Sequence, residues 1–259
     1  MHRVMLNTLS YGTPGDIPLV IVHGLFGSGR NWGVIARRLS DRWHVLTPDM
    51  RNHGDSPRSD SHGYPELAGD LAELIDAHGG RAHVVGHSMG GKAAMALALL
   101  HPDKVASLLV ADIAPVSYSH SQMPFIEAMR AVDLSRVEKR SDAVAQLAAN
   151  VADKSLQSFF TQSLDLKARR WTLNLDALAA EMPKILSFPD LDGHYSGPTL
   201  FLSGGQSDYV RPEHRETIRS LFPKARFAKM PQAGHWLHAD DPRGFEASVR
   251  AFLDAVAKR

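Results

Sequence analysis

Short apolar segments alternate with amphipathic segments along most of this chain, and that alternation is the strongest constraint on its fold. Five segments carry mostly apolar residues at successive positions, as strands covered on both faces do: residues 19–22, 44–46, 83–85, 108–110 and 199–202. Four others carry apolar residues at helical spacing, namely residues 32–39, 66–77, 89–100 and 212–221. Because parallel strands need a crossover between them, this order predicts an α/β fold in which helices flank a mostly parallel central sheet.

One long segment interrupts this order. Residues 116–190 contain three helical patterns, at residues 125–132, 143–151 and 173–182, and no convincing strand. The strand pattern resumes after Gly197. We therefore predict a core domain built from residues 1–115 and 196–259, with residues 116–195 inserted as a helical cap.

Charge and composition exclude several classes of function. The 29 Lys and Arg residues nearly balance the 28 Asp and Glu residues, so the chain lacks the basic surface that binding to nucleic acid requires. It has no Cys, which excludes disulfides, thiolate-bound metals and a cysteine nucleophile. No apolar segment approaches the roughly 20 residues of a membrane span, and residues 1–10 lack the apolar core of a signal peptide. We expect a cytoplasmic protein without stable membrane anchoring, and we expect no metal or cofactor, because the 14 histidines form no zinc signature.

The strongest local signal is a serine between two glycines at a strand-to-helix junction. Residues 86–90 read Gly-His-Ser-Met-Gly, directly after the strand at residues 82–85 and before the helix at residues 91–100. In this context the G-x-S-x-G pattern places the serine on a strained turn that exposes its hydroxyl, and the glycines let neighbouring segments pack closely around it. Ser88 is therefore the predicted nucleophile.

A serine hydroxyl needs a base and an acid from elsewhere in the chain. His235 is the predicted base, because it follows the strand expected at residues 226–230, as the chain order serine, acid, histidine requires. Two aspartates are candidates for the acid: Asp112 follows the strand at residues 108–110, and Asp208 follows the strand at residues 199–202. Both would emerge at the carboxyl edge of the sheet, so the choice between them stays open.

Backbone N–H groups are expected to bind the oxyanion that forms when an ester carbonyl is attacked. One is the N–H of Met89, next to the nucleophile. The other is expected from the loop at residues 23–27, where Leu25 is the first choice and Phe26 the second. Phe26 and Trp236 are also the residues expected to bind the substrate, and Trp236 is favoured because it neighbours His235.

Together these residues resemble the α/β-hydrolase superfamily, and more narrowly the small bacterial YbfF-type esterases and their animal homologues. The matching segments are HGLFGSGRNW (23–32), DMRNHGDSP (49–57), VGHSMGGKAAMALAL (85–99), DIAPV (112–116), NLDAL (174–178) and AGHWLHAD (233–240). The resemblance implies an α/β-hydrolase fold and a serine ester hydrolase in which Ser88 and His235 are catalytic. In the bacterial esterase the acid is the aspartate that matches Asp112, and the position that matches Asp208 is not acidic. This chain has both, so both stay candidates, with Asp176 as a remote third.

The leading interpretation is a cofactor-free serine esterase that hydrolyses small-molecule esters of short to medium chain length through an acyl-enzyme on Ser88. The inserted segment predicts a covered pocket of moderate size, which favours such chains. The same chemistry attacks thioesters, so an acyl-CoA thioesterase is an alternative, and carbon–carbon bond hydrolysis and perhydrolysis are weaker ones. A non-catalytic small-molecule receptor on the same fold is the remote alternative. We expect a monomer or a small homo-oligomer.

Overall fold

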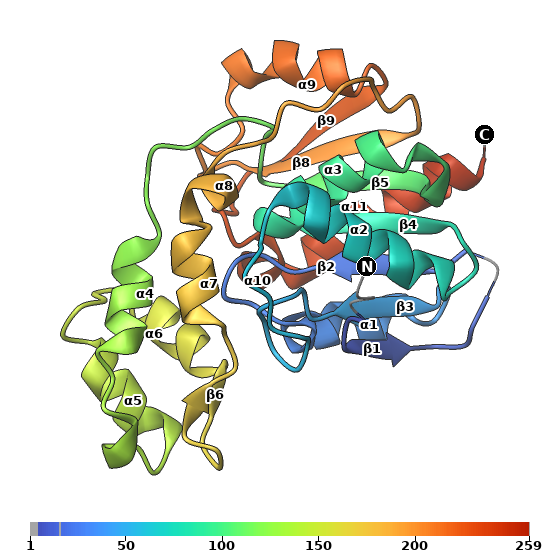
Figure 1. Ribbon diagram of the computed structural model, residues 1–259. Helices are drawn as coiled ribbons and strands as arrows, with labels where there is room; N and C mark the ends of the chain where they lie inside the picture. The colour runs from blue at the N-terminus through green and yellow to red at the C-terminus, as the bar shows by residue number, and fades with distance from the viewer. Residues whose placement is uncertain (1–4, 16, 259) are drawn as a thin grey trace.

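A central sheet with helices on both faces organises the protein, as Figure 1 shows. The computed structural model describes residues 5–15 and 17–258. The seven strands lie in the order β1 (Thr8–Tyr11), β3 (Val45–Pro48), β2 (Leu19–Val22), β4 (Ala82–His87), β5 (Val105–Ala111), β8 (Thr199–Gly204) and β9 (Ala225–Met230). Strand β1 pairs with β3 in the antiparallel direction, and every other pairing in this sheet is parallel. The predicted α/β fold with a mostly parallel sheet is therefore confirmed.

The strands contribute side chains to two apolar layers, one on each face of the sheet. In β2, Val20 and Val22 belong to one buried cluster, while Leu19 and Ile21 belong to the other, and all four side chains are fully buried. Burying one such side chain stabilises the fold by roughly 1.5–3 kcal/mol. Burial on both faces explains why the central strands read as continuous apolar segments rather than as alternating ones.

Helices on the two faces supply the other half of each apolar layer. Helices α2, α3 and α9 contribute buried side chains to the cluster around Val20, and helices α1 and α11 contribute to the cluster around Leu19. The bounds of the elements that accompany the core sheet are α1 (Gly33–Leu39), α2 (Tyr64–Asp76), α3 (Met89–Leu100), α9 (Arg215–Leu221), α10 (Leu237–Asp240) and α11 (Pro242–Ala257), with 3-10 helices at Gly29–Trp32, Pro102–Lys104 and Pro212–His214. Among the described residues, no helix combines the length and the apolar character needed to cross a bilayer.

The edge strand β1 is absent from the sequence-based prediction. Its four residues are half-buried or exposed, because β1 has a single neighbour, β3, and lies at the end of the sheet. Such a strand carries no continuous apolar segment, so it gives no signal of the kind that identified the buried strands. At the opposite edge, β9 begins one residue before the predicted range of 226–230.

Residues 116–195 form a group of helices beside the sheet (Figure 1). They contain α4 (Met123–Arg130), α5 (Arg140–Leu147), α6 (Lys154–Thr161), α7 (Leu175–Ala180), α8 (Met182–Leu186), a 3-10 helix at Leu134–Arg136, and the strands β6 (Leu164–Asp165) and β7 (Arg170–Trp171). The prediction of no strand in this segment is wrong, because β6 and β7 pair in the antiparallel direction. Each has two residues, too few for a strand period to show in the sequence.

The helical segment shares its apolar core with one face of the sheet. Ile126 of α4, Phe160 of α6 and Leu178 of α7 are each 1% exposed or less, and they belong to the same buried cluster as Val20 and Val22. The segment therefore packs on the core through a continuous apolar layer.

Candidate active site

Ser88 occupies the sharp turn between β4 and α3. Its φ of 53° lies in the left-handed region, which costs a residue other than glycine about 1–3 kcal/mol. The glycines on either side permit the turn: a Cβ atom at Gly86 would lie 2.3 Å from the carbonyl oxygen of Gly90, and one at Gly90 would lie 2.4 Å from the carbonyl oxygen of His23. Close backbone packing, as the sequence predicts, thus holds Ser88 at the carboxyl edge of the sheet and at the first turn of a helix.

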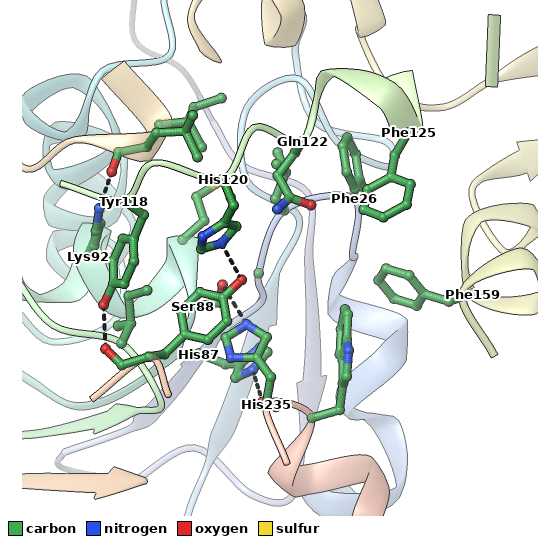
Figure 2. Close-up of a pocket in the computed structure, with 18 of the residues that line it drawn as sticks. Phe26, His87, Ser88, Lys92, Tyr118, His120, Gln122, Phe125, Phe159 and His235 are labelled. Atoms are coloured by element: carbon green, nitrogen blue, oxygen red, sulfur yellow. Dashed lines mark hydrogen bonds between the residues drawn. The ribbon is translucent and has the colours of Figure 1, made fainter. Parts of the chain in front are cut away.

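A continuous chain of hydrogen bonds joins Ser88, His235 and Asp112. The Nε2 atom of His235 lies 3.1 Å from the hydroxyl oxygen of Ser88 (Figure 2), and its Nδ1 atom lies 2.8 Å from a carboxylate oxygen of Asp112. Because an ionised carboxylate only accepts hydrogen bonds, Nδ1 carries the hydrogen and Nε2 is left to accept one from Ser88. This arrangement suits His235 to remove the proton of the Ser88 hydroxyl.

Asp112 is held in place by other donors as well. It follows β5 directly, has a φ of 50° and is fully buried. One carboxylate oxygen accepts the N–H of Gly204 at 2.9 Å, and the other accepts the hydroxyl of Ser207 in addition to His235. These donors satisfy a buried carboxylate, which would otherwise be costly to desolvate.

The two alternative candidates for the acid, Asp208 and Asp176, lie at the protein surface. The side chain of Asp208 is 80% exposed and pairs with Arg211 at 3.1 Å, and that of Asp176 is 92% exposed and pairs with Arg130. Neither is hydrogen-bonded to His235. In the loop after β8, the side chain that reaches the site is the hydroxyl of Ser207 rather than the carboxylate of Asp208, and this hydroxyl binds Asp112.

Two residues that line the same pocket as Ser88 have backbone N–H groups without an acceptor among the described residues. Within the part of the chain that the structure describes, the N–H groups of Leu25 and Met89 donate to no protein atom, and both residues line the cavity beside Ser88. Met89 is the first residue of α3, where N–H groups have no partner inside the helix. The N–H of Phe26 instead donates to Nε2 of His53 at 3.2 Å, so of the two candidates in this loop only Leu25 has a free donor.

Buried histidines support the loop that carries Leu25. His23 accepts the N–H of Met50 at 2.9 Å and donates from Nδ1 to the carbonyl oxygen of Gly24 at 2.8 Å. His53 was not among the residues expected from the sequence, although it lies in the matching segment at residues 49–57. It is fully buried, it packs between the rings of His23 and His62, and its partners are backbone groups. Burial lowers the pKa of His23, His53 and His62, and it lowers that of His62 to about 3.

Because of these buried histidines, we expect the unfolding free energy of the protein to depend on pH. Each has a folded-state pKa below its ordinary value of 6.5, so the unfolded chain binds more protons as the pH falls below 6.5. The unfolding free energy is therefore expected to decrease below pH 6.5, by as much as about 1.4 kcal/mol per pH unit for each histidine. Urea unfolding between about pH 8 and about pH 4 measures this slope.

A single substitution identifies the source of the slope. His62→Asn removes one buried titrating group. It is therefore expected to reduce the slope of the unfolding free energy against pH by up to about 1.4 kcal/mol per pH unit, which corresponds to one proton. His194→Gln, at an exposed position, is the matched control and is expected to keep the original slope. A His62→Asn protein with the same slope as the unsubstituted protein would contradict the prediction.

A cavity of about 250 Å³ surrounds Ser88. Figure 2 shows Ser88 between two groups of side chains: Phe26, Phe125 and Phe159 lie on one side, and Tyr118 and Lys92 lie on the other. Phe26 and Trp236, the two residues that the sequence analysis expected to bind substrate, both line this cavity. The aromatic wall comes from the core loop and from the helical segment together, which brings distant parts of the sequence to one pocket.

Lys92 links the core to the helical segment at the other side of the cavity. Its side chain is 1% exposed, donates to the carbonyl oxygens of Leu186 at 2.9 Å and Ser187 at 2.7 Å, and lies 4.8 Å from the ring of Tyr118. Burial lowers the pKa of Lys92 to about 7. Lys92 thus joins helix α3, one turn after Ser88, to the C-terminal end of α8.

Further hydrogen bonds join two of the segments that carry the family resemblance. Asn174, which precedes α7, donates from its backbone to the carbonyl oxygen of Asn52 and from its amide to the Asn52 side chain, both at 2.9 Å. Tyr64 donates to the carbonyl oxygen of Ile185 at 2.6 Å. The segments at residues 49–57 and 174–178 therefore belong to one contact between the core and the helical segment. Among the described residues, no group of three or more histidine or acidic side chains is arranged to hold a metal ion.

Comparison with known proteins places this site in context. Residues 17–242 match the family described as alpha/beta hydrolase fold. The chain is 44% identical to the sn-1-specific diacylglycerol lipase ABHD11 of Mus musculus, over 95% of this chain and 85% of the relative. It is 37% identical to the esterase YbfF of Escherichia coli (strain K12), over 92% of this chain and 93% of the relative. A solved structure described as a marine microorganism esterase is 37% identical, with a TM-score of 0.91 over 96% of this chain and 99% of that chain.

Proposed function

This chain belongs to the α/β-hydrolase family, and we propose on that basis that it is a serine esterase for short- to medium-chain carboxylic esters. The observation that carries the proposal is the hydrogen-bonded chain from Ser88 through His235 to Asp112, at 3.1 and 2.8 Å. A nucleophile, a base within hydrogen-bond distance and a third group that orients the base are the parts that acyl transfer by a serine requires.

The reaction follows from the positions of these groups. His235 takes the proton of the Ser88 hydroxyl at Nε2 as the serine oxygen attacks the ester carbonyl. Asp112 keeps the hydrogen on Nδ1 and stabilises the imidazolium. The N–H groups of Leu25 and Met89 donate to the oxyanion, His235 returns the proton to the leaving alcohol, and water then releases the acyl group from Ser88 by the same steps.

The cavity and the helical segment support a limit on the size of the acyl chain. We take residues 116–195 as a cap over Ser88, because α4, α6 and α8 contribute lining residues to the cavity of about 250 Å³. The hydrogen bonds of Lys92 and Asn174 tie this cap to the core, which favours a bounded pocket over an open groove. The aromatic side chains on one wall suit an apolar acyl group. An acyl-CoA substrate, a cytoplasmic location and a monomeric or small homo-oligomeric state stay predictions of the sequence.

Two measurements on the purified protein test the proposal. A fluorophosphonate, which reacts with activated serines, is expected to label one site, and peptide mass spectrometry is expected to map it to Ser88. Hydrolysis of p-nitrophenyl esters graded from acetyl to palmitoyl is expected to peak between about four and eight acyl carbons. Heat-denatured protein is the control for both. A folded protein that hydrolyses none of these esters and does not react with the fluorophosphonate would overturn the proposal, and faster turnover of matched acyl-CoA thioesters would redirect it to the thioesterase alternative.

A further inference from the structure

The imidazole of His235 contacts the rings of Tyr209 and His87. The Tyr209 ring stacks on it at a centroid distance of 3.9 Å and an interplanar angle of 19°. His87 lies 4.8 Å from it at 43°, and donates from Nε2 to the carbonyl oxygen of His235 at 2.8 Å. The imidazole therefore has little freedom to rotate out of the plane that contains its bonds to Ser88 and Asp112. Tyr209 is the residue after Asp208, and the sequence analysis did not single it out.

Tyr209 is itself fixed from the loop between β5 and α4. Its carbonyl oxygen accepts the hydroxyl of Tyr118 at 2.7 Å, and Tyr118 in turn accepts the N–H of Ala114 at 2.9 Å. Its own hydroxyl lies 2.6 Å from Nε2 of His120. Its N–H donates to the hydroxyl of Ser207 at 3.3 Å. These hydrogen bonds therefore fix the positions of both the backbone and the ring of Tyr209.

We propose that Tyr209 is a positioning residue for His235. Its ring holds the imidazole in line with Ser88 and Asp112, and its π-face stabilises the imidazolium that forms when His235 takes the serine proton. The face of an aromatic ring carries negative charge density, so it attracts a cation that lies against it. This inference rests on the proposed serine esterase function, because it assigns a role within the same reaction.

The other titratable groups around His235 are two histidines and the carboxylate of Asp112. His87, at the end of β4, contacts the ring of His235, and His238 of α10 contacts the ring of His87. Burial lowers the pKa of both, that of His238 to about 4. A histidine side chain is either neutral or cationic, so neither ring can supply a counter-charge to the imidazolium. Asp112 supplies the counter-charge at the edge of the ring, and Tyr209 covers its face. His120 contacts the hydroxyl of Tyr209.

Two substitutions of Tyr209 distinguish the effect of its aromatic ring from the effect of its hydroxyl. Tyr209→Leu removes the π-face and keeps an apolar side chain, and it is expected to lower kcat by about 10-fold with a much smaller change in KM. It is also expected to shift the acid limb of the kcat/KM profile to lower pH by about 0.5–1 unit, because the imidazolium loses a stabilising contact. Tyr209→Phe keeps the ring, and it is expected to restore kcat to within about threefold of the original value.

A second readout does not depend on turnover. The protonation of His235, followed by ¹⁵N NMR of the imidazole, is expected to shift to lower pH in Tyr209→Leu and not in Tyr209→Phe. If the unsubstituted protein hydrolyses no ester, the proposed function fails while the NMR titration still tests the contact. If Tyr209→Leu does not fold, Tyr209→Met is the second variant without a ring.

A matched control removes an aromatic stack away from the site. Phe227 of β9 stacks on Phe201 at 5.9 Å and 29°, so Phe227→Leu deletes a comparable contact on the sheet. It is expected to change neither kcat nor the His235 titration. The proposal is overturned if Tyr209→Leu keeps the original kcat and titration, if Tyr209→Phe loses as much as Tyr209→Leu, or if the loss appears only in KM, which would make Tyr209 a pocket wall.

Discussion

Replacing Ser88 with Ala is expected to lower kcat for ester hydrolysis by about 10⁶-fold. The alanine has no oxygen to attack the carbonyl, so His235 and Asp112 keep their positions without a nucleophile to activate. The backbone at this position keeps its φ of 53°, since alanine has a Cβ atom as serine does, and the unfolding free energy is expected to stay nearly the same. Initial rates on the preferred p-nitrophenyl ester and urea unfolding measure the two quantities.

A second serine provides the comparison. Ser220 lies at an exposed position of α9 and donates only to the carbonyl oxygen of Thr217, so Ser220→Ala is expected to keep full activity. If Ser88→Ala retained more than about 1% of the activity with the same chain-length profile, another group would have to be the nucleophile, and the role assigned to Ser88 would be wrong.

Replacing Asp112 with Asn is expected to lower kcat by about 10⁴-fold. The amide can donate to Nδ1 of His235, which places the imidazole hydrogen on Nε2 and leaves no lone pair to accept the serine proton. Asp208→Asn, the same chemical change in an exposed carboxylate paired with Arg211, is expected to alter kcat by less than about twofold. This pair of variants tests the choice of acid directly.

The measurement is kcat for both variants at a pH on the plateau of the unsubstituted protein. Thermal unfolding of each variant checks that Asp112→Asn is folded, because Asp112 also accepts the N–H of Gly204 and the hydroxyl of Ser207. Comparable losses in the two variants would show that no single aspartate orients His235. A large loss confined to Asp208→Asn would assign the role to Asp208 and contradict the geometry.

Local sequence was sufficient to identify the turn that carries Ser88. The apolar strand, the two glycines and the helix that follows are contiguous, and the steric need for glycine at residues 86 and 90 acts over a few residues. The buried strands were equally visible, because burial on both faces makes most of their positions apolar. The edge strand β1 and the two-residue strands β6 and β7 were missed, since half-buried or very short strands leave no such pattern.

The different surroundings of the two aspartates are visible only in the tertiary structure. Asp112 and Asp208 follow β5 and β8, which are neighbours in the sheet, so their positions in the sequence are equivalent to within a few residues. What separates them is the path of the chain after each strand. Asp112 turns inward at once with a φ of 50°, whereas the loop after β8 turns Ser207 inward and leaves Asp208 in solvent.

The sequence by itself determined the strand–helix order, the helical segment and the turn that carries Ser88, because periodicity and turn sterics are local properties. It also indicated His235, through its place after the last strand. Only the tertiary structure shows that His235 is hydrogen-bonded to Asp112, 123 positions away in the sequence, and that the ring of Tyr209 stacks on His235. It also shows that the N–H of Phe26 donates to His53, whereas the N–H of Leu25 has no acceptor among the described residues. These outcomes depend on how separate strands and loops meet at the sheet edge, and no short stretch of sequence contains that information.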